Sequence, residues 1–238
     1  MPTENEIKFL LDDTSGALEA ALASQVGLAD LEQLYMRGTG HAQVFRRRGQ
    51  AMFGIAFFIP TPKRAPGRSV VLETPISEAD FARLSSQKEI KGTSRIRSIT
   101  EQGARITRRL FTIKVDPCVK GVWGGNPLEI EFRIDKRTYE TLSQISRSRI
   151  TKKRATVTDG PIHWDVDFLK DGNGKTYIAM AEAEMPEGLT NPPRLLPIID
   201  PHIRYAVPKG DKRFNNAALS DHVAVRAMVA QLMLPSAA

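Results

Sequence analysis

Hydrophobic and polar residues alternate along most of the chain after Gly92, which is the pattern of strands that have two different faces. The predicted strands in this part are 95–99, 105–115, 128–134, 150–157, 163–169 and 177–185. A helix is expected over 136–145. The sequence Asp171-Gly172-Asn173-Gly174 predicts a hairpin turn between the last two strands. This pattern indicates a fold that is rich in sheet.

The earlier part of the chain and its C-terminal end have a more mixed pattern. Apolar residues recur at helical spacing after Ser15, and Gly27 interrupts them. The expected elements are strands at 7–11, 52–59 and 68–74, helices at 15–35, 78–84 and 217–234, loops at 38–49 and 60–67, and an irregular proline-rich segment at 192–201. Helices and strands together predict an α+β fold.

Seven of the predicted strands carry an apolar face and a face of ionisable residues. The residues on the ionisable faces are Glu4, Glu6 and Lys8; Arg95 and Arg97; Arg108 and Lys114; Glu129, Glu131 and Arg133; Lys152 and Arg154; Asp165 and Asp167; Glu182 and Glu184. An open antiparallel sheet with its charged side in water explains any one of these segments. Doublets that are almost purely acidic or purely basic favour a closed sheet whose charges point inward, because solvated faces usually mix polar residue types.

We therefore expect a closed or nearly closed antiparallel β-barrel of about eight strands, with helices packed outside it. Charges inside such a barrel must neutralise one another or a bound ligand. Paired carboxylates bind Mg²⁺ or Mn²⁺, and paired Arg and Lys side chains bind phosphate oxygens. The two together indicate a metal-assisted phosphoryl-transfer site with Mg²⁺ or Mn²⁺ as the cofactor.

The charge balance and the cysteine content narrow the class of partner. The chain has 34 basic and 27 acidic residues and a formal net charge of +7, which favours anionic partners. A small molecule that contains a triphosphate is expected, and RNA is a further candidate. The single cysteine, Cys118, allows no intramolecular disulfide. We see no signal peptide and no apolar run long enough for a membrane, so we expect a cytoplasmic protein.

Eight short motifs follow one another in a recognisable order. They are Glu4-Asn5-Glu6-Ile7-Lys8, Arg95-Ile96-Arg97, Leu110-Phe111-Thr112-Ile113-Lys114, Glu129-Ile130-Glu131, Lys152-Lys153-Arg154, Trp164-Asp165-Val166-Asp167-Phe168, Ala181-Glu182-Ala183-Glu184, and Asp211-Lys212-Arg213-Phe214-Asn215-Asn216 with Leu219. This series resembles the signature of the CYTH family, also called triphosphate tunnel metalloenzymes. The resemblance covers 4–8 and 95–219, and it implies an eight-stranded antiparallel tunnel that binds triphosphate with Mg²⁺ or Mn²⁺.

The same resemblance implies roles for individual residues. The metal ligands would be Glu4, Glu6, Glu129, Glu131, Glu182 and Glu184. The substrate-binding residues would be Lys8, Arg95, Arg97, Lys114, Lys152, Arg154 and Arg213. The catalytic residues would be Lys8, Lys114 and Asp167, where Asp167 orients a base or binds metal.

The segment 12–94 departs from the family pattern, because it is far longer than the family's usual link between the first two motifs. We expect a single domain over 1–238, with an insertion at about 12–94 and the C-terminal helix at about 217–234. Alternatively, the hairpin 52–74 supplies barrel strands, and Glu73 takes the place of Glu4 and Glu6.

Three activities fit the expected site. The first is metal-dependent hydrolysis of inorganic triphosphate, a nucleoside triphosphate or an RNA 5′-triphosphate. The second is a cyclase of the class IV adenylyl type on the same scaffold. The third is a module that binds nucleotides or RNA ends without turnover. No residue of the sequence separates the first two.

Overall fold

The computed structural model describes residues 6–36, 40–47, 52–61, 69–87, 89–115, 118–119, 122–123, 128–186, 189 and 194–232. Glu4 and the segment 62–68 lie outside these residues, so the predictions for Glu4 and for most of the loop 60–67 are not addressed.

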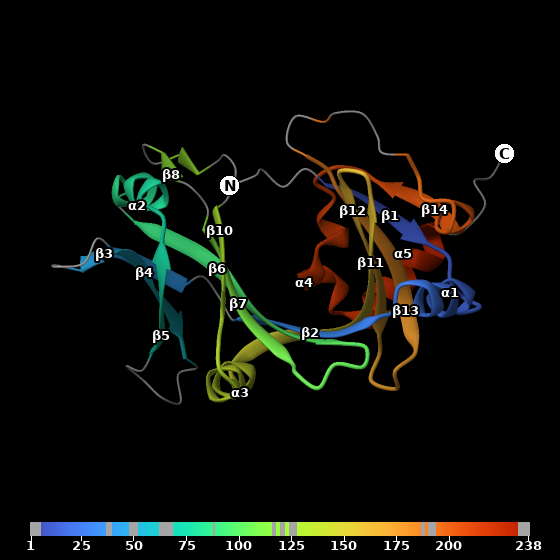
Figure 1. Ribbon diagram of the computed structural model, residues 1–238, viewed down its shortest axis with the longest axis horizontal. Coiled ribbons are helices and arrows are strands. Elements are labelled where there is room, and N and C mark those ends of the chain that lie inside the picture. Colours follow the sequence, from blue (N-terminus) through green and yellow to red (C-terminus); the bar gives the residue numbers. More distant parts are fainter. Residues whose placement is uncertain are drawn as a thin grey trace. The chain divides into compact units, whose positions relative to one another are not determined.

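Most strands belong to one twelve-stranded sheet, whose branches Figure 1 shows. Its order is β14 (Ile203–Val207), β1 (Glu6–Leu11), β13 (Thr176–Glu184), β12 (Ile162–Lys170), β11 (Ser146–Asp159), β2 (Ala29–Met36), β6 (Ile90–Glu101), β3 (Gly40–Arg47), β4 (Met52–Pro60) and β5 (Ser69–Ile76). Off this path, β7 (Arg108–Val115) pairs with β6 and with β10 (Leu128–Arg133). The short strands β8 (Cys118–Val119) and β9 (Val122–Trp123) pair with each other.

The sheet is open, so the prediction of a closed or nearly closed barrel is wrong. Within the described residues, the strand order ends at β14 on one side and at β5 on the other, and these two strands do not pair. The alternation of apolar and charged positions correctly located faces along each strand. It holds no information on whether the two edges of a sheet meet, because edge pairing depends on strands that are far apart in the sequence.

The chain divides into two compact units, which are described separately. The first unit contains Leu34–Arg97 and Arg108–Ser148, and the second contains Pro2–Gln33, Ser98–Thr107 and Arg149–Ala238. Three boundaries fall within the strands β2, β6 and β11, and another lies directly before β7. The segment 12–94 therefore contributes sheet strands to both units.

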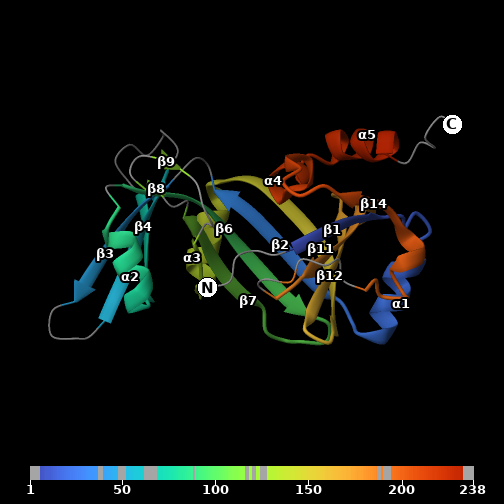
Figure 2. The same ribbon diagram turned by 90° about the horizontal axis from the view of Figure 1, so that it is seen from above.

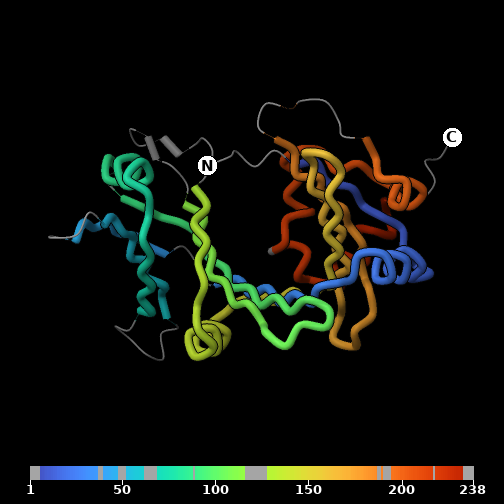
Figure 3. Tube along the Cα trace, viewed as in Figure 1, coloured from blue at the N-terminus to red at the C-terminus, as the bar shows by residue number. Residues whose placement is uncertain are grey.

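The second unit is built around β1, which pairs with β13 on one side and with β14 on the other. Figure 3 shows the blue N-terminal strand beside the orange strands from the end of the chain. One face of this sheet is apolar, and the helix α1 (Ala17–Gln25) packs there through Leu18 and Leu22 against Trp164 and Phe168. Figure 2 shows the C-terminal helices α4 (Asn216–Leu219) and α5 (His222–Leu232) on the other side of β1 and β14 from α1.

The first unit has its own hydrophobic core. Ile55 and Phe57 of β4 pack with Ile96 of β6 and with Phe111 and Ile113 of β7, and all five are fully buried. The helices α2 (Glu78–Ser85) and α3 (Lys136–Gln144) contribute Leu84, Tyr139 and Leu142 to this core. Ser77 caps α2 and Asp135 caps α3 by accepting a backbone N–H of the first turn.

Several local predictions differ from the structure. The predicted helix 15–35 ends at Gln25, because Gly27 has a φ of +78° and the chain continues as the strand β2. The predicted loop 38–49 contains the strand β3. A 3-10 helix at Asp200–His202 begins at the end of the segment 192–201 that was predicted to be irregular, and the strand β14 follows it. The C-terminal helix is two helices, since Asp221 accepts backbone N–H groups of Val223 and Ala224 and starts α5 anew.

Candidate functional site

The second unit has a charged face, which lies on the side of its sheet opposite the apolar face. The strand register places Lys8, Glu182 and Asp165 in one row across β1, β13 and β12. The next row holds Glu6, Glu184 and His163. Arg154 on β11 pairs with Asp167 on β12, and Lys152 lies two residues before Arg154 and so on the same face. The structure therefore brings the charged residues of four predicted strands together on four neighbouring strands of one unit.

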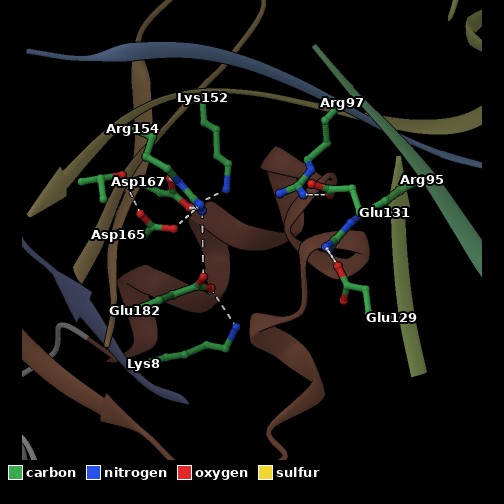
Figure 4. A network of polar contacts seen from close by, with 11 residues as sticks. Lys8, Arg95, Arg97, Glu129, Glu131, Lys152, Arg154, Asp165, Asp167 and Glu182 are labelled. Carbon is green, nitrogen blue, oxygen red and sulfur yellow. Dashed lines mark hydrogen bonds and ion pairs between the residues drawn. The ribbon is translucent and has the colours of Figure 1, made fainter. Parts of the chain in front are cut away.

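Asp167 is the centre of this network (Figure 4). Its carboxylate accepts a hydrogen bond from Lys152 Nζ at 2.5 Å and two from Arg154, from Nε and Nη2, both at 2.6 Å. Asp167 is only 3% exposed and Lys152 only 2% exposed. Arg154 also pairs with Asp165, which accepts a further hydrogen bond from the Thr156 hydroxyl at 2.7 Å. A solvated charged face does not bury its side chains in this way.

The pKa values of these groups follow from burial and from their neighbours. Burial alone would raise the pKa of Asp167, but Lys152 and Arg154 hold it well below its ordinary value. Burial would lower the pKa of Arg154, whereas Asp167 and Asp165 raise it. Burial lowers the pKa of Lys152, and the attraction of Asp167 offsets this only in part because Arg154 is a second cation nearby. Asp167 is therefore ionised, and it holds two crowded cations together.

Lys8 forms the second part of the network. Its Nζ donates to Glu182 Oε1 at 2.7 Å and lies 3.0 Å from Glu6 Oε1. Burial would lower the pKa of Lys8, but Glu182 and Glu6 raise it. Arg154 Nη2 lies 4.0 Å from the other oxygen of Glu182, which connects the two parts. Glu6 and Lys8 therefore lie in the sheet beside β13.

The carboxylates of this face have the chemistry of a site for a divalent cation. Glu6, Glu182, Glu184 and Asp165 occupy the two adjacent rows, and all four offer oxygen, which Mg²⁺ and Mn²⁺ prefer. Partial burial and the carboxylates of Asp165, Glu182 and Glu6 raise the pKa of Glu184, so negative charge is crowded here. Among the described residues no three His, Cys, Asp or Glu side chains converge as metal ligands. Glu182 and Asp165 instead accept hydrogen bonds from Lys8 and Arg154.

The first unit has a separate charged cluster on β6, β7 and β10. Arg95 Nη2 donates to Glu129 Oε1 at 2.6 Å, and Arg97 pairs with Glu131, which also accepts from the buried Thr112 hydroxyl at 2.9 Å. Lys114 is the register partner of Glu129. These predicted site residues therefore form acid–base pairs within the first unit. The contribution of Thr112 was not predicted, although it is in phase with Lys114 along the strand.

Two of the remaining residues lie apart from both clusters. Arg213 donates to Asp211 at 2.6 Å from Nη2, lies over the ring of Phe214 and also interacts with Tyr205 of β14. Glu73, the alternative to Glu4 and Glu6, is an exposed residue of β5 in the first unit and pairs with Arg47 at 3.5 Å. Sequence reasoning missed Thr156, whose position two residues after Arg154 was the available signal.

Comparison with known proteins adds little. No family model matches the chain, and no curated protein matches it. Among solved structures, one described as the PH1819 protein from Pyrococcus horikoshii OT3 is similar, with a TM-score of 0.36 and 12% identity over 98% of this chain and 92% of that one. A likeness at this level carries no argument about fold or function. In the described part of the chain, the helices are all too short or too polar to cross a membrane.

Proposed function

We propose that the charged face of the second unit binds a triphosphate together with Mg²⁺ or Mn²⁺ and hydrolyses it. The observation that supports this most is the burial of Lys152 and Asp167 within a network that holds Arg154 and reaches Lys8 through Glu182. Burying charged groups is unfavourable, and strongly perturbed groups cluster at functional sites. The sequence resemblance to triphosphate tunnel metalloenzymes adds the substrate class to this proposal.

Each part of the network has a role in the proposed reaction. Lys8, Lys152 and Arg154 would bind phosphate oxygens, and Arg154 suits this because a guanidinium contacts two oxygens at once. Asp167 would hold Lys152 and Arg154 in position, since it accepts hydrogen bonds from both. Glu6, Glu182 and Glu184 would hold the divalent cation, which would supply shielding of the phosphate charge when bound. Rate acceleration would rest on positioning and charge stabilisation, as in phosphoryl transfer generally.

A release assay tests this proposal. Orthophosphate and pyrophosphate would be measured from inorganic triphosphate, ATP and a 5′-triphosphorylated RNA, with Mg²⁺ and with Mn²⁺. We expect metal-dependent orthophosphate release that falls about 100-fold in Arg154→Gln, because one preorganised cation at the transition state is lost. Lys153→Gln is the matched control, since Lys153 is on the same strand but on the opposite face.

The outcomes separate the alternatives. Pyrophosphate release from ATP without orthophosphate would replace the hydrolase with a cyclase. Binding without any release would favour a module that holds a triphosphate. Equal release by wild type, Arg154→Gln and Lys153→Gln would place the activity elsewhere.

A further inference from the structure

Four basic side chains gather where β7, β10 and α3 of the first unit meet, and we call them the α3 basic patch: Arg108, Arg133, Lys136 and Arg137. Arg133 at the end of β10 pairs with Leu110 of β7, and the next residue, Ile134, donates its N–H to the carbonyl of Arg109 at 3.0 Å. The start of β7 is therefore beside the end of β10, and α3 begins at Lys136. All four members are exposed.

The charges of Arg133, Lys136 and Arg137 are poorly balanced by the described groups around them. Asp135 is used as the cap of α3, where it accepts the N–H of Thr138 at 2.8 Å. Glu140 lies 3.7 Å from Lys136, but both side chains are more than half exposed, so this pair is screened by water. Unlike Lys136, the side chains of Arg133 and Arg137 form no hydrogen bond or ion pair with the described residues.

The position of two of these cations is unfavourable for the helix itself. The first turn of α3 has no acidic residue, while it contains Lys136 and Arg137. A helix N-terminus carries partial positive charge, so cations there oppose the helix dipole by about 0.3–1 kcal/mol each. Among the contacts described for α3, the exposed Lys136–Glu140 pair is the only one that offsets this cost. The arrangement concentrates positive potential at the surface instead, which is useful for an anionic partner.

We propose that the α3 basic patch binds the sugar–phosphate backbone of a nucleic acid. Guanidinium groups contact phosphate oxygens in pairs, and the net charge of +7 attracts polyanions to the molecule. Interfaces with proteins usually need an apolar or aromatic anchor. Among the described residues, the exposed hydrophobic Ile106 lies two residues before Arg108, but no exposed large hydrophobic side chain lies in β10 or α3, which favours a phosphate backbone over an acidic protein. This inference does not depend on the proposed hydrolysis, because no patch residue belongs to the charged face of the second unit.

Fluorescence anisotropy of labelled 20-nucleotide single-stranded RNA and DNA, titrated at several salt concentrations, tests the inference. The patch variant is Arg133→Gln/Lys136→Gln/Arg137→Gln. The control is Arg83→Gln/Lys175→Gln/Lys209→Gln, which removes the same amount of charge from exposed residues on other parts of the surface. Arg83 belongs to α2, which lies at the opposite end of the first unit from α3 (Figure 1).

We expect the patch variant to bind at least tenfold more weakly than the control at low salt. Its salt slope should fall by about 2, since each single-strand phosphate contact contributes about 0.7. Its melting temperature should equal or exceed that of the wild type, because the cations that oppose the α3 dipole are gone. Equal losses in the two variants would overturn the inference, as would absence of binding by the wild type. Stronger competition by polyglutamate than by unlabelled oligonucleotide would also overturn it and assign the patch to an acidic protein.

Discussion

Replacing Asp167 by asparagine tests the buried network of the second unit at its centre. The substitution keeps the shape of the side chain and removes the charge that neutralises Lys152 and Arg154. Lys152 is 2% exposed, so its ammonium group would lose its hydrogen-bonded counter-charge in a place with almost no water, and Glu182 would be the remaining carboxylate that attracts it. Removing one partner of a buried ion pair destabilises a protein by about 3–5 kcal/mol. At roughly 2–4 °C per kcal/mol for a chain of this size, the melting temperature should fall by about 6–20 °C.

Urea denaturation followed by tryptophan fluorescence measures this loss, since Trp164 is fully buried in the same unit. Lys153→Gln is the control for a charge change on the neighbouring strand β11. Lys152→Met should restore part of the stability of Asp167→Asn, because it removes the unpaired cation. A loss below about 1 kcal/mol in Asp167→Asn is typical of exposed ion pairs and would refute the buried network.

The pH dependence gives an independent check. The pKa of Asp167 is depressed in the folded state, so its contribution is present above the unfolded value of about 3.9 and is lost as the pH falls through the folded value. The difference in unfolding free energy between wild type and Asp167→Asn should therefore be constant above about pH 5 and shrink at lower pH. A difference that stays constant down to pH 2 would contradict the depressed pKa.

Two further substitutions test packing outside the network. A Cβ at Gly92 would lie 2.5 Å from the backbone carbonyl oxygen of Lys114, so Gly92→Ala should lower the unfolding free energy measured in urea by about 1–3 kcal/mol. Gly172 has open space around it, so the control Gly172→Ala should change stability by less than about 0.5 kcal/mol. Equal effects would contradict the close approach of β6 and β7. The Tyr177 hydroxyl donates to the carbonyl of Leu219 at 2.7 Å, so Tyr177→Phe should lower the unfolding free energy by about 0.5–1.5 kcal/mol. Burial raises the pKa of Tyr177 to about 12, so the substitution should leave the ultraviolet titration of the native protein's tyrosines below pH 10 unchanged. A loss of titration signal below pH 10 would show that this hydroxyl is not buried.

The sequence was informative wherever side-chain direction is set by neighbouring residues. Alternation alone placed Lys152 and Arg154 on one face of their strand, and Asp165 and Asp167 on one face of theirs. In the structure, the two strands are neighbours and these residues share one face of the sheet. Burial of Lys152 could not be read from this pattern, because it depends on how the whole unit packs.

Longer-range features were not accessible in the same way. The leucines of 15–35 suit one face of a helix, and Leu31 and Leu34 are buried equally well in the strand β2. The left-handed backbone at Gly27 decides between the two structures. Closure of the sheet failed as a prediction for a related reason, since nothing local to β14 or β5 encodes whether their edges meet.

Equilibrium binding of a non-hydrolysable imido-bridged triphosphate, measured by calorimetry with Mn²⁺, tests the central claim most directly. The charged face of the second unit predicts saturable binding by wild type and by Lys153→Gln, and affinity at least tenfold weaker in Arg154→Gln. Equal affinity in all three proteins, or no binding by the wild type, would contradict a triphosphate site on this face.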